Sequence, residues 1–62
     1  MKREWLIKLR NKTKLSQLEV AKLCDVTQQM YGQIENGIRR PSPELAQKLG
    51  KVLNFDWTKF YK

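Results

Sequence analysis

The sequence predicts an all-α fold, a compact bundle of five helices. Apolar residues recur at helical spacing, Ser or Thr stands at three candidate helix N-termini, and no alternating run bounded by turn residues indicates a strand. The 62 residues include 40% hydrophobic side chains, which is too apolar for a disordered tail. A chain of this length has room for one domain, which we expect to span residues 1–62.

The first predicted helix carries an apolar stripe that begins at Trp5, and it ends near Lys12. The second follows Ser16, a candidate N-cap whose hydroxyl can accept a hydrogen bond from the backbone amide of Glu19. Glu19 lies three residues later and completes a capping box. This helix is expected to run to about Cys24.

The third predicted helix follows a second N-cap candidate, Thr27, and runs to about Asn36. It stops at Gly37, which can adopt the positive φ of a residue just past a helix end. Only residues 25–26 separate the N-cap from the second helix. A connection this short makes the two helices cross steeply, which predicts a helix-turn-helix over about residues 16–36.

The fourth predicted helix has the clearest apolar period, from Leu45 to Leu53. Ser42 is its candidate N-cap, and a proline occupies the favoured first helical position. Asn54 can stop the helix in a left-handed conformation. Asp56 can then cap a last short turn, the fifth helix, which is rich in aromatic residues.

The charge of the chain is strongly positive and unevenly distributed. Thirteen Lys and Arg residues against six Asp and Glu residues give a net charge of +7. Segment 1–14 has six basic residues and one acidic, segment 37–62 has six and two, and segment 15–36 has one and three. This balance favours a polyanionic partner, either nucleic acid or an acidic membrane surface. With DNA, basic flanks would grip phosphate while a polar centre reads base edges.

One face of the third predicted helix is uncharged and rich in amides. On a helical wheel it consists of Gln28, Gln29, Gly32, Gln33 and Asn36, and the opposite face is apolar. A Gln side chain can bond N6 and N7 of adenine together in the major groove. We therefore interpret this face as one that reads base edges, with ordinary solvated glutamines as the alternative.

Residues between 15 and 42 carry a resemblance to a known family. They are Leu15-Ser16-Gln17, Val20-Ala21, Cys24, Val26-Thr27, Tyr31, Ile34-Glu35-Asn36-Gly37 and Pro41-Ser42. The chain resembles the Xre-type helix-turn-helix family of lambdoid phage repressors and Cro proteins from residue 6 to 61, which implies a lambda-repressor-like DNA-binding domain. Three positions depart from the family pattern: Asp25 replaces a turn Gly, Cys24 a Leu, and Tyr31 an Ile or Val.

The resemblance implies base-reading roles for Gln28, Gln29 and Gln33. It implies contacts to the DNA backbone for a set of polar residues around them, namely Gln17, Thr27, Asn36, Arg39, Arg40 and Arg10. For Arg39 the minor groove or solvent are the alternatives. For Arg10 the family often has an ion pair with the residue at Glu35, so we assign that pair a structural role.

Catalysis and metal binding have no support in the residue pattern. The chain has no His, its single cysteine is expected in the core, and two of its serines are explained as caps. No enzyme activity, cofactor or small-molecule ligand is therefore expected. The lone cysteine, the lack of an apolar run long enough for a membrane span, and the lack of a signal peptide predict a cytoplasmic protein. An amphipathic membrane-surface role for residues 2–14 is the weaker alternative.

We therefore expect a sequence-specific transcriptional regulator, a phage or mobile-element repressor or Cro-like protein that binds a palindromic double-stranded DNA operator as a homodimer. Candidates for the dimer surface are Phe55, Trp57 and Tyr61, with core packing as an equal alternative. A second possible function is a protein-binding antitoxin or antirepressor on the same fold. Leu18 and Leu23, apolar where the wheel faces outward, favour that alternative.

Overall fold

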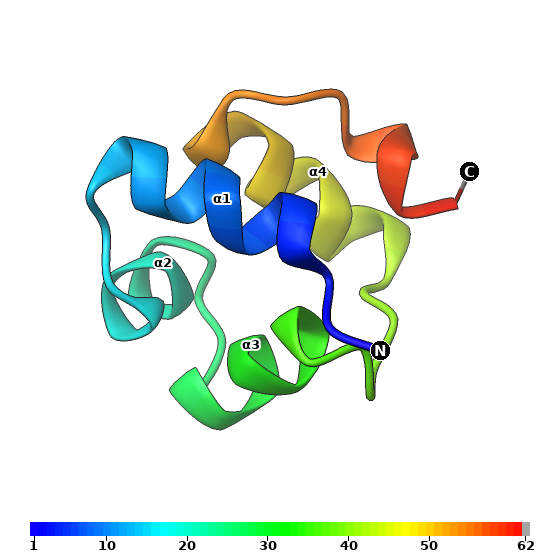
Figure 1. Cartoon of the computed structure of the whole chain (residues 1–62), viewed down its shortest axis with the longest axis horizontal. Helices are drawn as coiled ribbons and strands as arrows, with labels where there is room; N and C mark the ends of the chain where they lie inside the picture. Colours follow the sequence, from blue (N-terminus) through cyan, green and yellow to red (C-terminus); the bar gives the residue numbers. More distant parts are fainter. Residues whose placement is uncertain (62) are drawn as a thin grey trace.

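Four α-helices and one short 3-10 helix form within residues 1–61, the part of the chain described by the computed structural model (Figure 1). They are α1 (Glu4–Thr13), α2 (Gln17–Leu23), α3 (Gln28–Glu35), α4 (Pro43–Leu53) and the 3-10 helix η1 (Trp57–Tyr61). Each begins and ends within a residue or two of its predicted bounds. Lys62, the last residue of the predicted domain, lies outside the described residues.

Three helices begin at the side-chain caps that the sequence predicts. Ser16, Thr27 and Ser42 each accept a hydrogen bond from the backbone amide three residues later, at 3.1, 3.1 and 3.3 Å. At α2 the capping box is complete, because the Glu19 carboxylate accepts a hydrogen bond from the Ser16 amide at 2.8 Å. These caps fix the start of α2 and α3, and therefore the geometry of the helix-turn-helix.

Left-handed residues end the helices and shape the turn. Asp25, Gly37 and Asn54 have φ values of 61°, 76° and 60°, and for Gly37 and Asn54 the sequence predicts this conformation. Lys14, with φ of 62°, is a fourth such residue that the sequence did not indicate. In the turn, Asp25 takes the conformation for which the family prefers glycine, so the departure from the family pattern leaves the turn intact.

The fifth predicted helix is a 3-10 turn. Asp56 Oδ1 accepts a hydrogen bond from the Thr58 amide at 3.1 Å, and the Lys59 amide bonds to the Asp56 carbonyl at 3.0 Å. This i+3 spacing closes a turn with fewer residues than an α-helix needs, which suits a segment of five residues. Within residues 1–61 the bundle therefore has four α-helices and one 3-10 helix, instead of five equivalent helices.

Every helix contributes to one buried core. Its fully or nearly buried apolar residues are Leu6, Val20, Ala21, Cys24, Tyr31, Ile34, Leu45, Ala46, Leu49, Leu53 and Phe60. Cys24 is only 1% exposed, which confirms its predicted packing role. Beside this core, the rings of Trp5, Phe55 and Phe60 pack edge to face with centroids 5.1–5.7 Å apart. These rings join α1 to η1 and to the segment before it.

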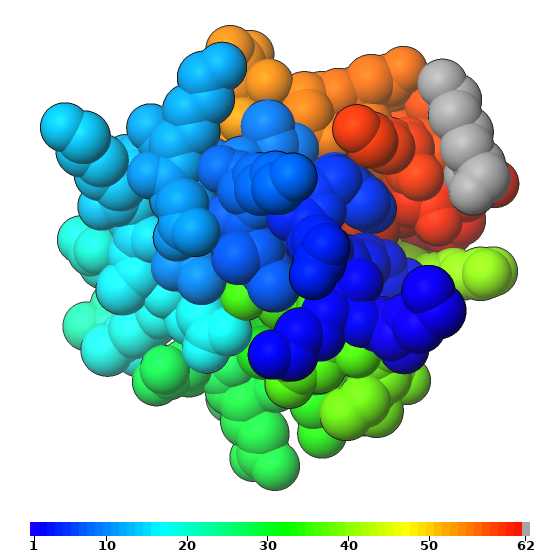
Figure 2. Space-filling model, viewed as in Figure 1, coloured from blue at the N-terminus to red at the C-terminus, as the bar shows by residue number. Residues whose placement is uncertain are grey.

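The first three residues of the chain lie against the end of α3. The Arg3 amide donates to the Glu35 carbonyl at 2.7 Å, and the Arg3 guanidinium donates to the carbonyls of Ile34 and Arg39. Figures 1 and 2 show this N-terminal arm beside the green segment that follows α3. The arm therefore holds the loop between α3 and α4, a contact that the sequence pattern did not predict.

Gly50 in α4 is required by close packing, which gives a stability prediction. A Cβ at this position would lie 2.8 Å from the Phe55 carbonyl oxygen and 3.1 Å from the Trp57 Cβ. We expect Gly50→Ala to lower the free energy of unfolding by about 1–2 kcal/mol, because overpacking outweighs the better helix propensity of Ala. Urea unfolding measures this change. Equal or higher stability would contradict the predicted clash.

Candidate nucleic-acid interface

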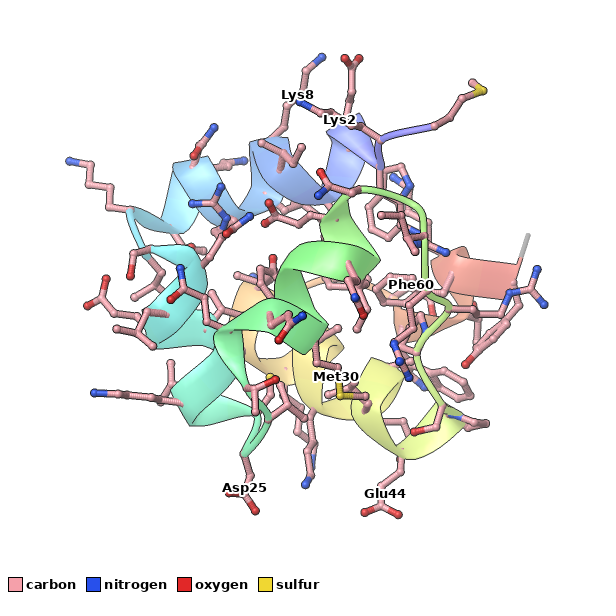
Figure 3. The ribbon with its side chains drawn as sticks, turned by 90° about the horizontal axis from the view of Figure 1, so that it is seen from below. Lys2, Lys8, Asp25, Met30, Glu44 and Phe60 are labelled. Carbon is pink, nitrogen blue, oxygen red and sulfur yellow. The ribbon has the colours of Figure 1, made fainter. Side chains whose placement is uncertain are left out.

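The glutamine face of α3 points out of the bundle. Figure 3 looks onto α3, which lies nearest the viewer with no other helix in front of it. Gln28 and Gln29 are exposed and Gln33 is partly exposed, whereas Tyr31 and Ile34 on the opposite face are buried. The division between the two faces of this helix thus agrees with the helical wheel. The predicted base-reading side chains are available to a ligand.

The loop after α3 folds back onto Gln33. Backbone amides of Ile38 and Arg39 donate to the Gln33 carbonyl at 3.0 and 3.2 Å, and Arg39 Nε donates to Gln33 Oε1 at 3.2 Å. A shallow hollow of about 280 Å³ opens here, lined by Gln33, Arg39, Thr27, Gln29 and Met30. Arg39 is therefore held beside the predicted base-reading residues and projects its charge at the edge of the same face.

A buried carboxylate, Glu35, joins three helices behind that face. Glu35 is 1% exposed, and the Arg10 guanidinium contacts its two oxygens at 2.5 and 3.4 Å. The Tyr31 hydroxyl donates to Glu35 Oε2 at 2.6 Å, and Gln17 Nε2 donates to Oε1 at 2.9 Å. The predicted Arg10 pair is confirmed, and Tyr31 has found the partner that its hydroxyl needs. The bonds from Tyr31 and Gln17 were not predicted.

The charge state of Glu35 follows from these partners. Burial alone would raise the pKa of this carboxyl, but hydrogen bonds from Arg10, Tyr31 and Gln17 outweigh burial and hold the pKa below its ordinary value. Glu35 is therefore ionised at neutral pH. The same pair raises the pKa of Arg10, mainly through the hydrogen bond to Glu35. Arg10 thus belongs to the scaffold, and a phosphate contact by this residue stays a prediction.

The loop before α4 brings a predicted phosphate contact next to a predicted dimer residue. Arg40 is exposed and its guanidinium lies 5.9 Å from the centroid of the Tyr61 ring. The Tyr61 hydroxyl donates to the Pro41 carbonyl at 2.8 Å, and its ring packs edge-on against Trp57 at 6.1 Å. Tyr61 is 40% exposed. Phe55 and Trp57, the other two dimer candidates, are partly buried and pack against the core, and a dimer contact by any of the three stays a prediction.

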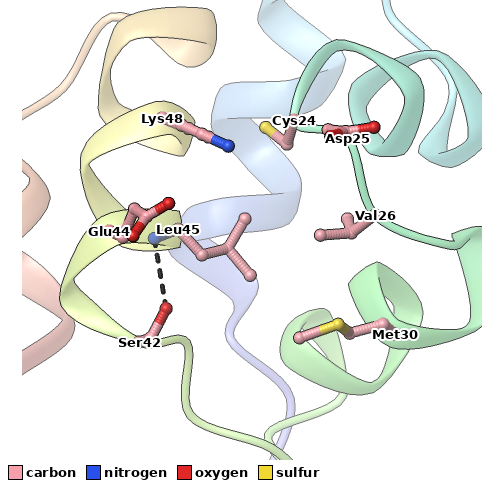
Figure 4. A pocket seen from close by; sticks show the side chains of 8 residues that line it. All are labelled: Cys24, Asp25, Val26, Met30, Ser42, Glu44, Leu45 and Lys48. Carbon is pink, nitrogen blue, oxygen red and sulfur yellow. Dashed lines mark hydrogen bonds between the residues drawn. The ribbon is translucent and has the colours of Figure 1, made fainter.

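A second hollow lies between the helix-turn-helix turn and the start of α4. Figure 4 shows its lining, and its volume is about 270 Å³. The carboxylates of Asp25 and Glu44 flank it, and in Figure 3 they lie at the edge of the molecule opposite Lys2 and Lys8. Burial raises the pKa of the Cys24 thiol despite the nearby charge of Lys48, so the thiol stays protonated and unreactive. Two carboxylates and one cation, Lys48, line this hollow, so it does not form a positively charged site for a polyanion.

Apolar side chains on the outside of α2 match the alternative of a protein-binding module. Leu18 and Leu23 are 44% and 61% exposed, as the helical wheel predicts. Ile38, in the loop after α3, is 75% exposed and was not predicted. These side chains are available to a protein partner.

Neither a metal-binding cluster nor a membrane-spanning helix is found within residues 1–61. No cluster of three or more His, Cys, Asp and Glu side chains with the geometry for a metal ion occurs there. No helix in that part of the chain has the length and apolar composition to cross a bilayer.

Comparison with known proteins places the chain among helix-turn-helix proteins. A family model described as helix-turn-helix matches residues 6–60. The chain is also 44% identical over 62 residues to an uncharacterised HTH-type transcriptional regulator, YqaF, from Bacillus subtilis strain 168. That alignment covers 100% of this chain and 82% of the relative.

The Glu35 network predicts a specific dependence of stability on pH. Because the pKa of Glu35 is lowered by folding, its contribution to stability is complete above the ordinary carboxyl value of 4.5 and is lost as pH falls through the lower folded-state pKa. We expect Glu35→Gln to lower the free energy of unfolding by about 3 kcal/mol near neutral pH, because Arg10 loses its partner. The difference from wild type should shrink in acid.

Urea unfolding across the acidic range measures both profiles. The exposed Glu44 offers a comparison variant, Glu44→Gln, which removes one carboxylate without changing the Glu35 network. Parallel profiles for wild type and Glu35→Gln would contradict the assignment of acid sensitivity to Glu35.

Proposed function

We propose a function from the premise that the chain belongs to the Xre-type helix-turn-helix family, which its match over residues 6–60 establishes. The proposed function is sequence-specific binding of double-stranded DNA by a cytoplasmic transcriptional regulator, a repressor or Cro-like protein of phage or mobile-element type. One observation supports this function above the others. The uncharged, amide-rich face of α3, the helix that follows the tight turn after α2, is exposed.

Base reading would come from the glutamines of α3. In a helix-turn-helix the second helix enters the major groove and presents its first residues to base edges. Gln28 and Gln29 are the first two residues of α3, and Gln33 lies on the same face. Each amide offers both a donor and an acceptor, so a Gln can distinguish adenine from the other bases. No other residue of α3 on this face is charged, and Arg39 from the loop after α3 lies at its edge, where it bonds to Gln33.

Contacts to the DNA backbone would come from residues that surround this face. Gln17 opens α2, Thr27 is the N-cap of α3, and Asn36, Arg39 and Arg40 follow α3. Thr27, Asn36, Arg39 and Arg40 are exposed. These contacts would fix the register of the glutamines, and the cations among them would make binding weaken with salt.

A homodimer would span the two half-sites of a palindromic operator. One recognition helix reads only a few base pairs, so two copies would bind half-sites about 34 Å apart. Tyr61 is the most accessible of the three candidates for the contact between copies, because it is 40% exposed whereas Phe55 and Trp57 are partly buried against the core. Tyr61 also touches Arg40, so the dimer surface and a DNA contact would share one rim of the domain.

A protein-binding role is the second candidate, and the exposed Leu18 and Leu23 are the observation in its favour. Footprinting on the DNA upstream of the gene for this protein separates the two functions. A protected palindrome supports the regulator. Absence of protection, together with a bound protein partner that is lost on Leu23→Ser, would favour the antitoxin or antirepressor.

Base reading by α3 predicts a loss of sequence discrimination. We expect Gln28→Ala, Gln29→Ala or Gln33→Ala each to weaken operator binding by about 1–3 kcal/mol, because a bidentate contact to a base is lost. Binding to a random-sequence duplex should stay close to that of the wild type. Titrations of both duplexes by fluorescence anisotropy measure the two affinities.

Arg40→Ala is the control for this experiment, because Arg40 is exposed in the loop after α3 and is assigned to the DNA backbone under the proposed function. It should weaken binding to operator and random duplex alike. Equal losses on both duplexes for the glutamine variants would contradict direct base reading.

A further inference from the structure

The three glycines of the chain differ in what surrounds them. At Gly37 a Cβ would lie 1.8 Å from the Met1 carbonyl oxygen, and at Gly50 it would lie 2.8 Å from the Phe55 carbonyl oxygen. The fold itself thus excludes a side chain at both positions. At Gly32 the nearest atoms to a Cβ are the Gln17 side-chain amide atoms, at 3.7 and 4.0 Å, which is ordinary van der Waals contact.

Glycine at position 32 therefore lowers the stability of α3, and packing within the fold does not explain why a glycine is present. It is the fifth of eight residues in α3, and the positive φ that favours glycine occurs at Gly37 instead. Glycine inside a helix is less favourable than Ala by about 1 kcal/mol, which is a large fraction of the stability of a small domain. Since an Ala would fit the chain at this position, the missing side chain points to something outside the chain.

The surroundings of Gly32 indicate what approaches it. Gly32 is partly exposed and lies on the same face of α3 as Gln28 and Asn36. Gln17 crosses beside it from the start of α2, held by the hydrogen bond to Glu35 at 2.9 Å. Gln17 and Asn36 are both assigned to the DNA backbone under the proposed function, so Gly32 lies between two backbone contacts.

We propose that Gly32 is a DNA-affinity determinant, a gap in the side chains of α3 through which the sugar–phosphate backbone of bound DNA packs directly against the helix beside Gln17. This inference rests on the proposed function and deepens it, because it assigns a binding role to a residue with no side chain. Glycine permits such a close approach of a ligand to main chain. The lower helix stability that glycine causes in α3 accompanies the room that it leaves for the DNA backbone.

The experiment compares Gly32→Ala with the wild type on two duplexes. One is a short duplex that the wild-type protein selects from a random-sequence pool, and the other is a scrambled duplex of the same length. We expect Gly32→Ala to raise Tm by about 4–8 °C, through better helix propensity. We also expect it to weaken binding to both duplexes by about tenfold, because a methyl group is forced into a packed contact. Circular dichroism and fluorescence anisotropy measure the two effects.

Asn11→Ala provides the matched control. Asn11 is an exposed position inside α1, outside the helix-turn-helix, where Ala also improves helix propensity. It should raise Tm and leave both affinities unchanged, which separates added stability from altered binding. A variant that melts higher but binds less tightly cannot owe its weaker binding to misfolding.

The remaining outcomes overturn the inference in distinguishable ways. Unchanged affinity of Gly32→Ala for both duplexes would show that nothing packs on this position. A loss confined to the selected duplex would put a base edge there and overturn the assignment to the backbone. Failure of the wild-type protein to bind either duplex would overturn the proposed function, and this inference with it.

Discussion

The buried carboxylate of Glu35 is the constraint on which the arrangement of the candidate interface depends. An isolated charge in the core would be strongly destabilising, so Glu35 must be matched by donors from several directions. Arg10 comes from α1, Gln17 from α2, and Tyr31 from one turn earlier in α3. Satisfying one group therefore fixes how three helices cross. The glutamine face of α3 points outward because Glu35 and Tyr31 hold the other side of that helix in the core.

The polar residues around α3 are organised before any ligand arrives. Arg39 bonds to Gln33, Arg40 lies over Tyr61, and Gln17 bonds to Glu35. Side chains that are already held lose less conformational entropy on binding, so these contacts favour a rigid recognition surface. The N-terminal arm adds to this order, because Arg3 bonds to carbonyls at the end of α3 and in the loop that follows. Both ends of the described chain thus brace the loop that carries Arg39 and Arg40.

Stability and recognition depend on largely separate sets of residues in this small domain, and Gln17, which bonds to Glu35, belongs to both. The core is shared by every helix, whereas the proposed DNA contacts come from α2, α3 and the loop after α3. Where the two demands meet, the sequence departs from what helix propensity favours, as at Gly32. Asp25 and Glu44 lie on one side of α3 and Lys2 and Lys8 on the other (Figure 3), so a polyanion bound at α3 would meet an asymmetric distribution of charge.

The sequence by itself determined the features that depend on residues close together in the chain. Ser16, Thr27 and Ser42 cap their helices, Asn54 ends α4, and the turn at residues 25–26 closes, because each involves bonds over a few residues. The outward face of α3 followed from its period. The tertiary structure alone decided the bonds of Gln17 to Glu35 and of Arg3 to Ile34, which join residues 18 and 31 positions apart. It also decided that Phe55 and Trp57 pack against the core and that Gly32 has room for a side chain. Such contacts depend on the angles at which helices cross, and those angles are set only when the whole core packs.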